Sequence, residues 1–148
     1  MAGLDLLATQ DVIASHIETT FSNYEVKQDT ILDDESILKL DNKVKPFIDL
    51  RWHQLNRSPA NASFAGVRHD EYSSAVDIIF VGPTPRIARQ GLNMVMQELI
   101  GWQIPDGSQL TPEGGQSVLP VFDYNAKPHL YIAISTLSFQ VNTSDIGT

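Results

Sequence analysis

The sequence predicts an α+β fold for a single domain of 148 residues. Two stretches carry apolar side chains at helical spacing, which indicates two helices. Two alternating stretches joined by a polar loop indicate a long antiparallel hairpin, and a third alternating stretch lies near the end of the chain. The length is typical of one domain around one core.

The first predicted helix covers roughly residues 9–22. Its apolar side chains recur every three to four residues and line one face; they are Val12, Ile13, Ile17 and Phe21. Thr9 is the expected N-cap, and Asp11 is expected in the first turn, where the helix dipole favours a carboxylate. His16 lies beside the apolar face, and we interpret it as a partly exposed helix histidine.

Residues 29–43 are predicted to form an acidic loop region. Residues 1–43 contain nine acidic and three basic side chains, a balance of −6 within the total of −8. The run Asp33-Asp34-Glu35 lacks the spaced oxygen ligands and the turn glycine of a calcium loop, so we expect it to be solvated. Periodicity does not assign the short apolar piece at residues 37–40.

A long antiparallel hairpin is predicted in the middle of the chain. In its first strand, residues 45–55, alternation creates a face expected to be buried, with Ile48, Leu50 and Trp52. The other face is expected to be wet, with Asp49, Arg51 and His53. The second strand covers residues 72–81 and becomes apolar on both faces, which is typical of a strand inside a sheet.

The second helix has the clearest boundaries. Thr84 is the expected N-cap, Pro85 suits the first helical position, and Gly101 suits the C-terminal cap. The apolar face has helical spacing and consists of Ala88, Gly91, Leu92, Val95 and Leu99. Met94 and Met96 widen this face, which fits either deeper burial or a subunit contact.

The rest of the chain is less regular. Residues 102–127 are punctuated by proline and glycine and are predicted to be a long loop or contact arm, with a possible short strand at 117–122. The last strand covers residues 129–141, with Leu130, Ile132 and Ile134 on one face, and residues 142–148 form a polar tail.

No catalytic, cofactor or metal motif is present in the sequence, so we predict a protein that is not an enzyme. Zero cysteines exclude a thiolate nucleophile and cysteine-ligated metals. The glycines do not form a phosphate-binding loop, and the four histidines lack the spacing of a zinc hydrolase. Neither a secretory signal nor a membrane span is expected. The acidic balance argues against a protein that grips nucleic acid.

The arginines are separated from the acidic excess along the chain. They all lie between residues 51 and 89 and are Arg51, Arg57, Arg68, Arg86 and Arg89. This polarity predicts head-to-tail association of identical subunits, in which these arginines meet a neighbour's Asp33, Asp34 and Glu35. Ordinary mixed surface charge remains the alternative.

A second hypothesis is a small-molecule enzyme or binding module. Its site would lie between the sheet and the 102–127 loop, in a closed apolar pocket that holds Asp49, His53 and Asp77. Asp49 and Asp77 could pair as acid and base, or they could oppose Arg51 or a base of another subunit.

The chain resembles the tail terminator proteins of long-tailed, siphovirus-like bacteriophages. In residues 64–72 a glycine, an arginine and acidic residues (Gly66, Arg68 and Asp70-Glu71) precede a hydrophobic strand. That strand ends at Phe80-Val81-Gly82-Pro83, and the helix after it ends at Leu99-Ile100-Gly101. The resemblance covers roughly residues 45–141, and the N-terminal helix agrees in order only.

The resemblance implies a mixed, mainly antiparallel sheet flanked by two helices. It also implies a hexameric ring that caps the tail tube, ends tube polymerisation and provides the surface on which the head docks. The partners would be further copies of the chain, the tail tube protein and a head–tail connector, and DNA would pass through the lumen without specific binding.

The same resemblance places the protein at the head-proximal end of the virion tail, after assembly in the host cytoplasm. Another neck, connector or tail completion protein is the alternative. The acidic stretch at residues 29–43 departs from the family pattern, so its role in the ring or in head contacts stays open.

Overall fold

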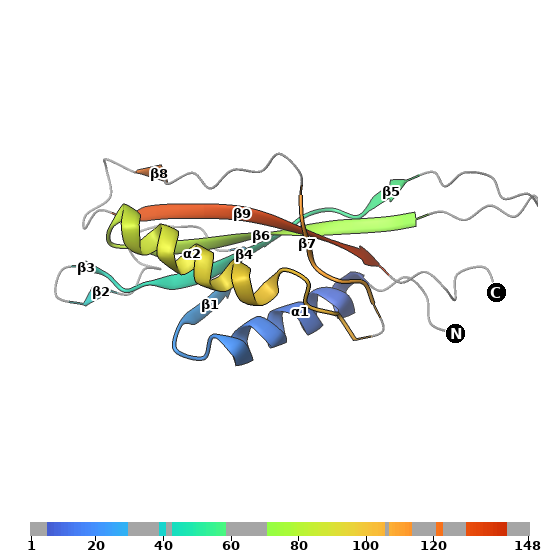
Figure 1. Ribbon diagram of the computed structural model, residues 1–148, viewed down its shortest axis with the longest axis horizontal. Helices are drawn as coiled ribbons and strands as arrows, with labels where there is room; N and C mark the ends of the chain where they lie inside the picture. Colours follow the sequence, from blue (N-terminus) through green and yellow to red (C-terminus); the bar gives the residue numbers. More distant parts are fainter. Residues whose placement is uncertain are drawn as a thin grey trace, which may run out of the picture.

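A computed structural model describes residues 6–29, 39–40, 43–58, 71–105, 107–113, 121–122 and 130–141. These residues form an α+β fold with a mixed, mainly antiparallel sheet (Figure 1). The helices are α1 (Leu6–Thr20) and α2 (Pro85–Leu99). The strands are β1 (Glu25–Gln28), β2 (Lys39–Leu40), β3 (Lys43–Val44), β4 (Phe47–Trp52), β5 (Asn56–Ser58), β6 (Glu71–Gly82), β7 (Thr111–Pro112), β8 (Val121–Phe122) and β9 (Tyr131–Val141).

The predicted hairpin forms the centre of the sheet. The strand order is β1-β4-β6-β9-β7, with β5 paired to β6 and β8 paired to β9. Strands β4 and β6 are antiparallel, and β6 lies between β4 and β9, as its apolar faces predicted. Strand β1 pairs in parallel with β4 and makes the sheet mixed. A short separate sheet is formed by β2 and β3.

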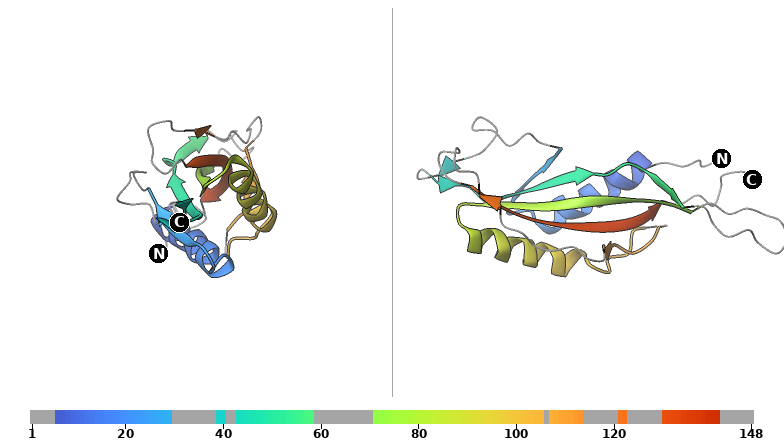
Figure 2. Two further views of the ribbon diagram at one scale, coloured as in Figure 1. Left: turned by 90° about the vertical axis from the view of Figure 1, so that its left-hand side faces the viewer. Right: turned by 90° about the horizontal axis from the view of Figure 1, so that it is seen from above.

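Both helices pack against the same face of the sheet (Figures 1 and 2). The buried side chains of α1 are Ile13, Ala14, Ile17 and Phe21. They share one apolar cluster with α2 and with alternate residues of the sheet, including Leu50, Ile78, Phe80 and Leu137. This cluster is the main core.

Helix α1 begins earlier than the sequence predicted. It already includes Leu6, so Thr9 lies inside the helix and Asp11 lies beyond the first turn. Val12 was expected on the buried face and is 39% exposed. Successive helical residues point about 100° apart, so a face centred on Ile13 and Ile17 turns Val12 towards solvent.

The predicted boundaries of α2 are confirmed. The Thr84 Oγ1 atom accepts a hydrogen bond of 3.1 Å from the backbone N–H of Ile87, and Pro85 is the first helical residue. Gly101 has a φ of +84°, which a residue without Cβ adopts at low cost. Met96 is buried and Met94 packs against the main core, which favours burial for the widened apolar face.

Gly91 is the point of closest approach between α2 and the sheet. A Cβ atom at this position would lie 2.2 Å from the Phe80 ring. Only glycine permits this contact without displacement of the ring or the helix.

On the other face of the sheet, the prediction that one side of the first hairpin strand is solvent-exposed is wrong for part of β4. Phe47 is 2% exposed and Asp49 is fully buried, so this face of β4 is not wet along its length. The reason is a second apolar cluster on this face, formed by Phe47, Ile79, Val81 and Leu130. Ile132 and Ile134 pack against this cluster, on the strand face on which they were predicted to lie.

The segment after α2 folds back on the domain in its first half. Ile104 and Leu110 are buried in the main core, and the Gly101 N–H donates to the Leu110 carbonyl at 2.8 Å. Strand β7 then pairs with β9. Strand β8 lies within the predicted short strand and also pairs with β9.

Several sequence predictions concern residues outside the described ranges. The acidic loop is described only at residues 29, 39–40 and 43. The residues that lie outside are Asp33, Asp34, Glu35, Arg68 and the polar tail 142–148.

Candidate functional site

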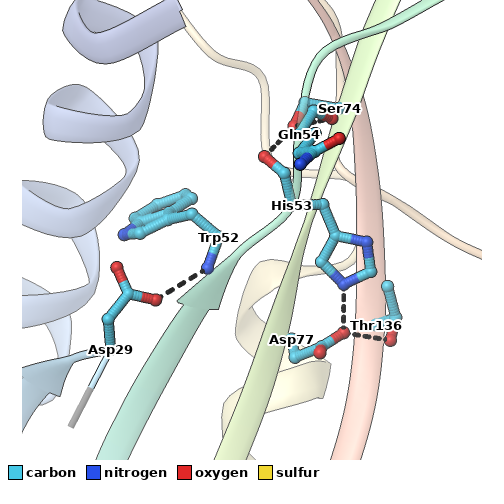
Figure 3. Close-up of polar contacts among 7 residues, drawn as sticks. All are labelled: Asp29, Trp52, His53, Gln54, Ser74, Asp77 and Thr136. Carbon is cyan, nitrogen blue, oxygen red and sulfur yellow. Dashed lines mark hydrogen bonds and ion pairs between the residues drawn. The ribbon is translucent and has the colours of Figure 1, made fainter.

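A polar cluster lies on the sheet face opposite the helices (Figure 3). The His53 Nε2 atom is 2.8 Å from Asp77 Oδ1, and the Thr136 hydroxyl donates to the same oxygen at 2.6 Å. The side chains of His53 and Asp77 are 38% and 22% exposed. One oxygen of the Asp77 carboxylate therefore contacts both the His53 ring and the Thr136 hydroxyl. His53 and Asp77 are both partly exposed to solvent.

Strand register brings this cluster together. Asp77 of β6 pairs with Arg51 of β4 on one side and with Thr136 of β9 on the other, so the three side chains share a face. His53 follows β4 on the same alternation. Ser74 secures the backbone there, because its hydroxyl contacts the carbonyls of His53 and Gln54 at 3.0 and 3.1 Å (Figure 3).

The ends of β1 and β4 are joined beside this cluster. The Trp52 backbone N–H donates to Asp29 Oδ1 at 3.2 Å, and the Trp52 indole N–H donates to Gln28 Oε1 at 3.0 Å. Asp29 has a φ of +50°, a left-handed conformation that short polar residues tolerate. These contacts lie just beyond the last pair of the parallel β1–β4 ladder, Gln28 and Leu50, on the side of His53.

The cluster only partly matches the site of the enzyme hypothesis. His53 and Asp77 do meet, but Asp49 pairs with Arg51 at 3.3 Å instead of with Asp77. A nucleophile–base pair requires a hydroxyl within hydrogen-bond reach of the base. The Thr136 hydroxyl instead donates to Asp77, so it is not aligned as a nucleophile activated by His53.

A cavity of about 570 Å³ lies near the far end of the same strands. It is open to solvent and most of its lining residues are polar, in contrast to the closed apolar pocket that the enzyme hypothesis required. The lining residues are Ser73, Ser108, Gln109, Thr111, Glu113, Ser138, Phe139 and Gln140. Asp49, His53 and Asp77 are not among them.

The outer face of α2 presents two arginines. Arg86 and Arg89 are both exposed and lie about one turn apart. Within the described ranges, neither has a carboxylate at ion-pair distance. Arg86 is in the first turn of the helix, where the dipole disfavours positive charge. The helix dipole therefore does not explain why an arginine stands at this position.

The other predicted interface residues are placed differently or are not described. Arg51 is half-exposed and its charge is paired with buried Asp49. Arg57 belongs to β5, opposite Tyr72 of β6, but its side chain is not described. Arg68 and the acidic group Asp33, Asp34 and Glu35 lie outside the described residues, so their predicted pairing stays a prediction.

A ring contact joins α1 to the turn after α2. The His16 imidazole stacks on the Trp102 indole, with ring centroids 3.8 Å apart and planes 8° from parallel. Burial lowers the pKa of His16 below its ordinary value of 6.5, and the Glu98 carboxylate opposes this effect. Stacking explains why His16 is half-buried beside the apolar face.

Comparison with known proteins identifies no family for the chain: no family model matches it, and no curated protein matches it in sequence. The helices of the described part are too short and too polar to cross a membrane. Within the same residues, no group of three or more histidine or acidic side chains is arranged to hold a metal ion.

Sequence reasoning missed Thr136 and Trp102 as contact residues. Thr136 is an ordinary polar residue in an alternating strand until the register sets it opposite Asp77. Trp102 directly follows Gly101, which predicts a turn at this point. Nothing in the neighbouring sequence predicts that the Trp102 indole stacks on His16. Pairing of distant segments is the missing information in both cases.

Proposed function

We propose that the chain is a structural, non-enzymatic virion protein of a long-tailed bacteriophage. It forms a ring that caps the tail tube, ends tube polymerisation and provides the surface on which the head docks. The observation that carries the proposal is the exposed pair Arg86 and Arg89 on α2, which has no acidic partner among the described residues. A subunit that associates through charge presents such groups to its neighbours.

The fold agrees with this proposal. In the described part of the segment that resembles tail terminators, the antiparallel pair β4–β6 is followed directly by the capped helix α2. The sheet is mixed and has two helices packed on it, which is the architecture that the resemblance implies. The resemblance also supplies the hexameric state of the proposed ring.

The partners follow from the position in the particle. Further copies of the chain complete the ring, the tail tube protein lies below it, and a head–tail connector lies above it. The ring occupies the head-proximal end of the tail after assembly in the host cytoplasm. A net charge of −8 suits a lumen through which DNA passes without being held, because acidic walls repel phosphate.

Mass measurement of the purified chain, alone and with tail tubes, tests the proposal. We expect a ring of identical subunits and tubes that stop growing once capped, while uncapped control tubes continue to lengthen. A strict monomer that never caps a tube would refute the function. Imaging of particles with an antibody against the chain separates a terminator from another neck protein, since the two lie at different levels of the head–tail joint.

A further inference from the structure

The outer face of α1 is the acidic counterpart of the arginine face on α2. Leu7, Asp11 and Glu18 are exposed and recur at intervals of four and seven residues, so they share one side of the helix. Leu7 is 67% exposed. Val12 is 39% exposed but points about 100° away from Asp11 around the helix, so it lies outside this face. This acidic face of α1, Leu7, Asp11 and Glu18, combines two carboxylates with one exposed leucine side chain.

The arginine face of α2, Arg86 and Arg89, has the complementary charge. Arg86 and Arg89 are three residues apart and lie on one side of the helix, whereas Ile87 points about 100° away from Arg86. No described carboxylate pairs with either arginine, and no described cation pairs with Asp11 or Glu18. Each face therefore holds two like charges, and the signs of the two faces are opposite.

One charge of each pair, Arg86 on α2 and Glu18 on α1, also opposes the dipole of its own helix. Arg86 is the second residue of α2, where the dipole is positive, and the first turn contains no acid. Glu18 is in the last turn of α1, where the dipole is negative, and that turn contains no base. Contact between the start of α2 and the end of α1 would relieve both conflicts at once.

The arrangement of the helices prevents this contact within one chain but permits it between chains. The two helices run in opposite directions, so the start of α2 and the end of α1 point towards the same end of the molecule (Figure 1). Seen along the long axis, they occupy different sides of the outline (Figure 2, left). A subunit with two different neighbours in a ring needs two such faces.

From these observations we infer that a second copy of this chain docks its α1 acidic face, carrying Asp11 and Glu18, on the α2 arginine face, carrying Arg86 and Arg89. The contact is head to tail and repeats around the ring. This inference rests on the proposed function for closure of the ring, and it assigns the acidic partner to α1 instead of to Asp33, Asp34 and Glu35.

A charge-exchange experiment tests the docking. One variant carries Arg86→Glu and Arg89→Glu, and the other carries Asp11→Lys and Glu18→Lys. We expect each variant alone to lose ring formation, because it presents two faces of the same sign. Mixed in equal amounts, they should form rings of alternating subunits, because every contact then joins opposite charges. Analytical ultracentrifugation and native mass spectrometry measure the assemblies.

The controls separate charge pairing from general repulsion and from misfolding. Gln97→Glu adds an acid to the exposed far end of α2 and should leave assembly unchanged. All four exchanged residues are exposed, so each variant should keep the circular dichroism of the parent chain. At a protein concentration too low for assembly, its Tm should equal or slightly exceed that of the parent, because Arg86→Glu and Glu18→Lys remove charges that oppose the helix dipoles. The single exchanges Arg89→Glu and Glu18→Lys repeat the test with one change in each chain. Raising the salt from about 0.1 M to 1 M shortens the screening length from about 10 Å to 3 Å and should weaken the parent ring at least tenfold.

The outcomes distinguish this inference from the proposed function. If the parent chain forms rings and either reversed variant does so too, the docking is wrong and the proposed function stands. If a variant with Asp33→Lys and Asp34→Lys, rather than Asp11→Lys and Glu18→Lys, assembles with the arginine-reversed chain, the acidic face is the other one and the inference is overturned. A parent chain that stays monomeric even with tail tubes refutes the proposed function itself.

Discussion

Gly91→Ala offers the sharpest test of how α2 is seated on the sheet. A Cβ at this position would lie 2.2, 2.3 and 2.4 Å from three carbons of the Phe80 ring. Ordinary contact begins at 3.4 Å, so the ring or the helix must move by about 1.2 Å. Phe80 has little room to move, because it is 1% exposed and its ring meets Tyr24 edge-on at 5.3 Å.

Two effects of opposite sign set the magnitude. Alanine is preferred to glycine inside a helix by about 1 kcal/mol. Overpacking of a core costs about 1–3 kcal/mol, and a displacement above 1 Å falls at the upper end of that range. We therefore expect Gly91→Ala to lower the free energy of unfolding by about 1–2 kcal/mol, or the Tm by roughly 3–8 °C for a chain of this length.

Urea unfolding followed by circular dichroism measures this change at a fixed protein concentration, since association would also shift apparent stability. Asn93→Ala, at an exposed position of the same helix, is the matched control and should be neutral or stabilising. In a Phe80→Leu background the ring carbons are absent, so the loss caused by Gly91→Ala should fall by at least half. A Gly91→Ala chain as stable as the parent would refute the close approach of α2 and β6.

Three further predictions concern single contacts. Thr84→Ala removes the cap of α2 and should cost about 1 kcal/mol in urea unfolding, whereas Thr84→Ser should cost much less. Because burial lowers the pKa of His16, the unfolded chain binds its proton more readily. Stability should therefore be full above pH 6.5 and fall as the pH drops below it, and His16→Gln should flatten this dependence of Tm on pH. Thr136→Val removes the hydroxyl that donates to Asp77 and should lower the unfolding free energy by about 1 kcal/mol; no change would show that the contact is dispensable.

Local signals in the sequence predicted those elements whose boundaries depend on neighbouring residues. Thr84, Pro85 and Gly101 act within one turn of the helix they delimit, so their residue types suffice to place α2. Alternation likewise predicts the hairpin, because a register shift of one residue would turn its apolar side chains to the wrong face.

Elements defined by distant partners were not predictable in this way. Strand β1 is four residues long and partly exposed, and it is a strand because β4 pairs with it. Asp49 looks like a solvent-facing residue in the alternating pattern, yet the second apolar cluster buries it beside Phe47. Its contact with Arg51, two residues away on the same face, was one of the alternatives that the sequence left open.

The candidate site shows the same division. Sequence position identified the arginines as a group, but only the structure separates Arg51, paired with Asp49, from exposed Arg86 and Arg89. His53 and Asp77 were named together from their strand positions, and the contact at 2.8 Å shows that they meet. The accompanying Thr136 depends on the register of β6 with β9, which no local pattern reveals.

The two faces of α2 allow stability and assembly to be tested separately. Its buried face meets Phe80 through Gly91, and its outer face carries Arg86 and Arg89, which contact no described carboxylate. Gly91→Ala should therefore lower Tm while leaving the charges that pair subunits in place. Reversal of Arg86 and Arg89 should abolish assembly while Tm of the isolated chain stays close to that of the parent. If the two kinds of change instead moved both properties together, the outer face would be part of the fold, and the proposed division between core and docking surface would be wrong.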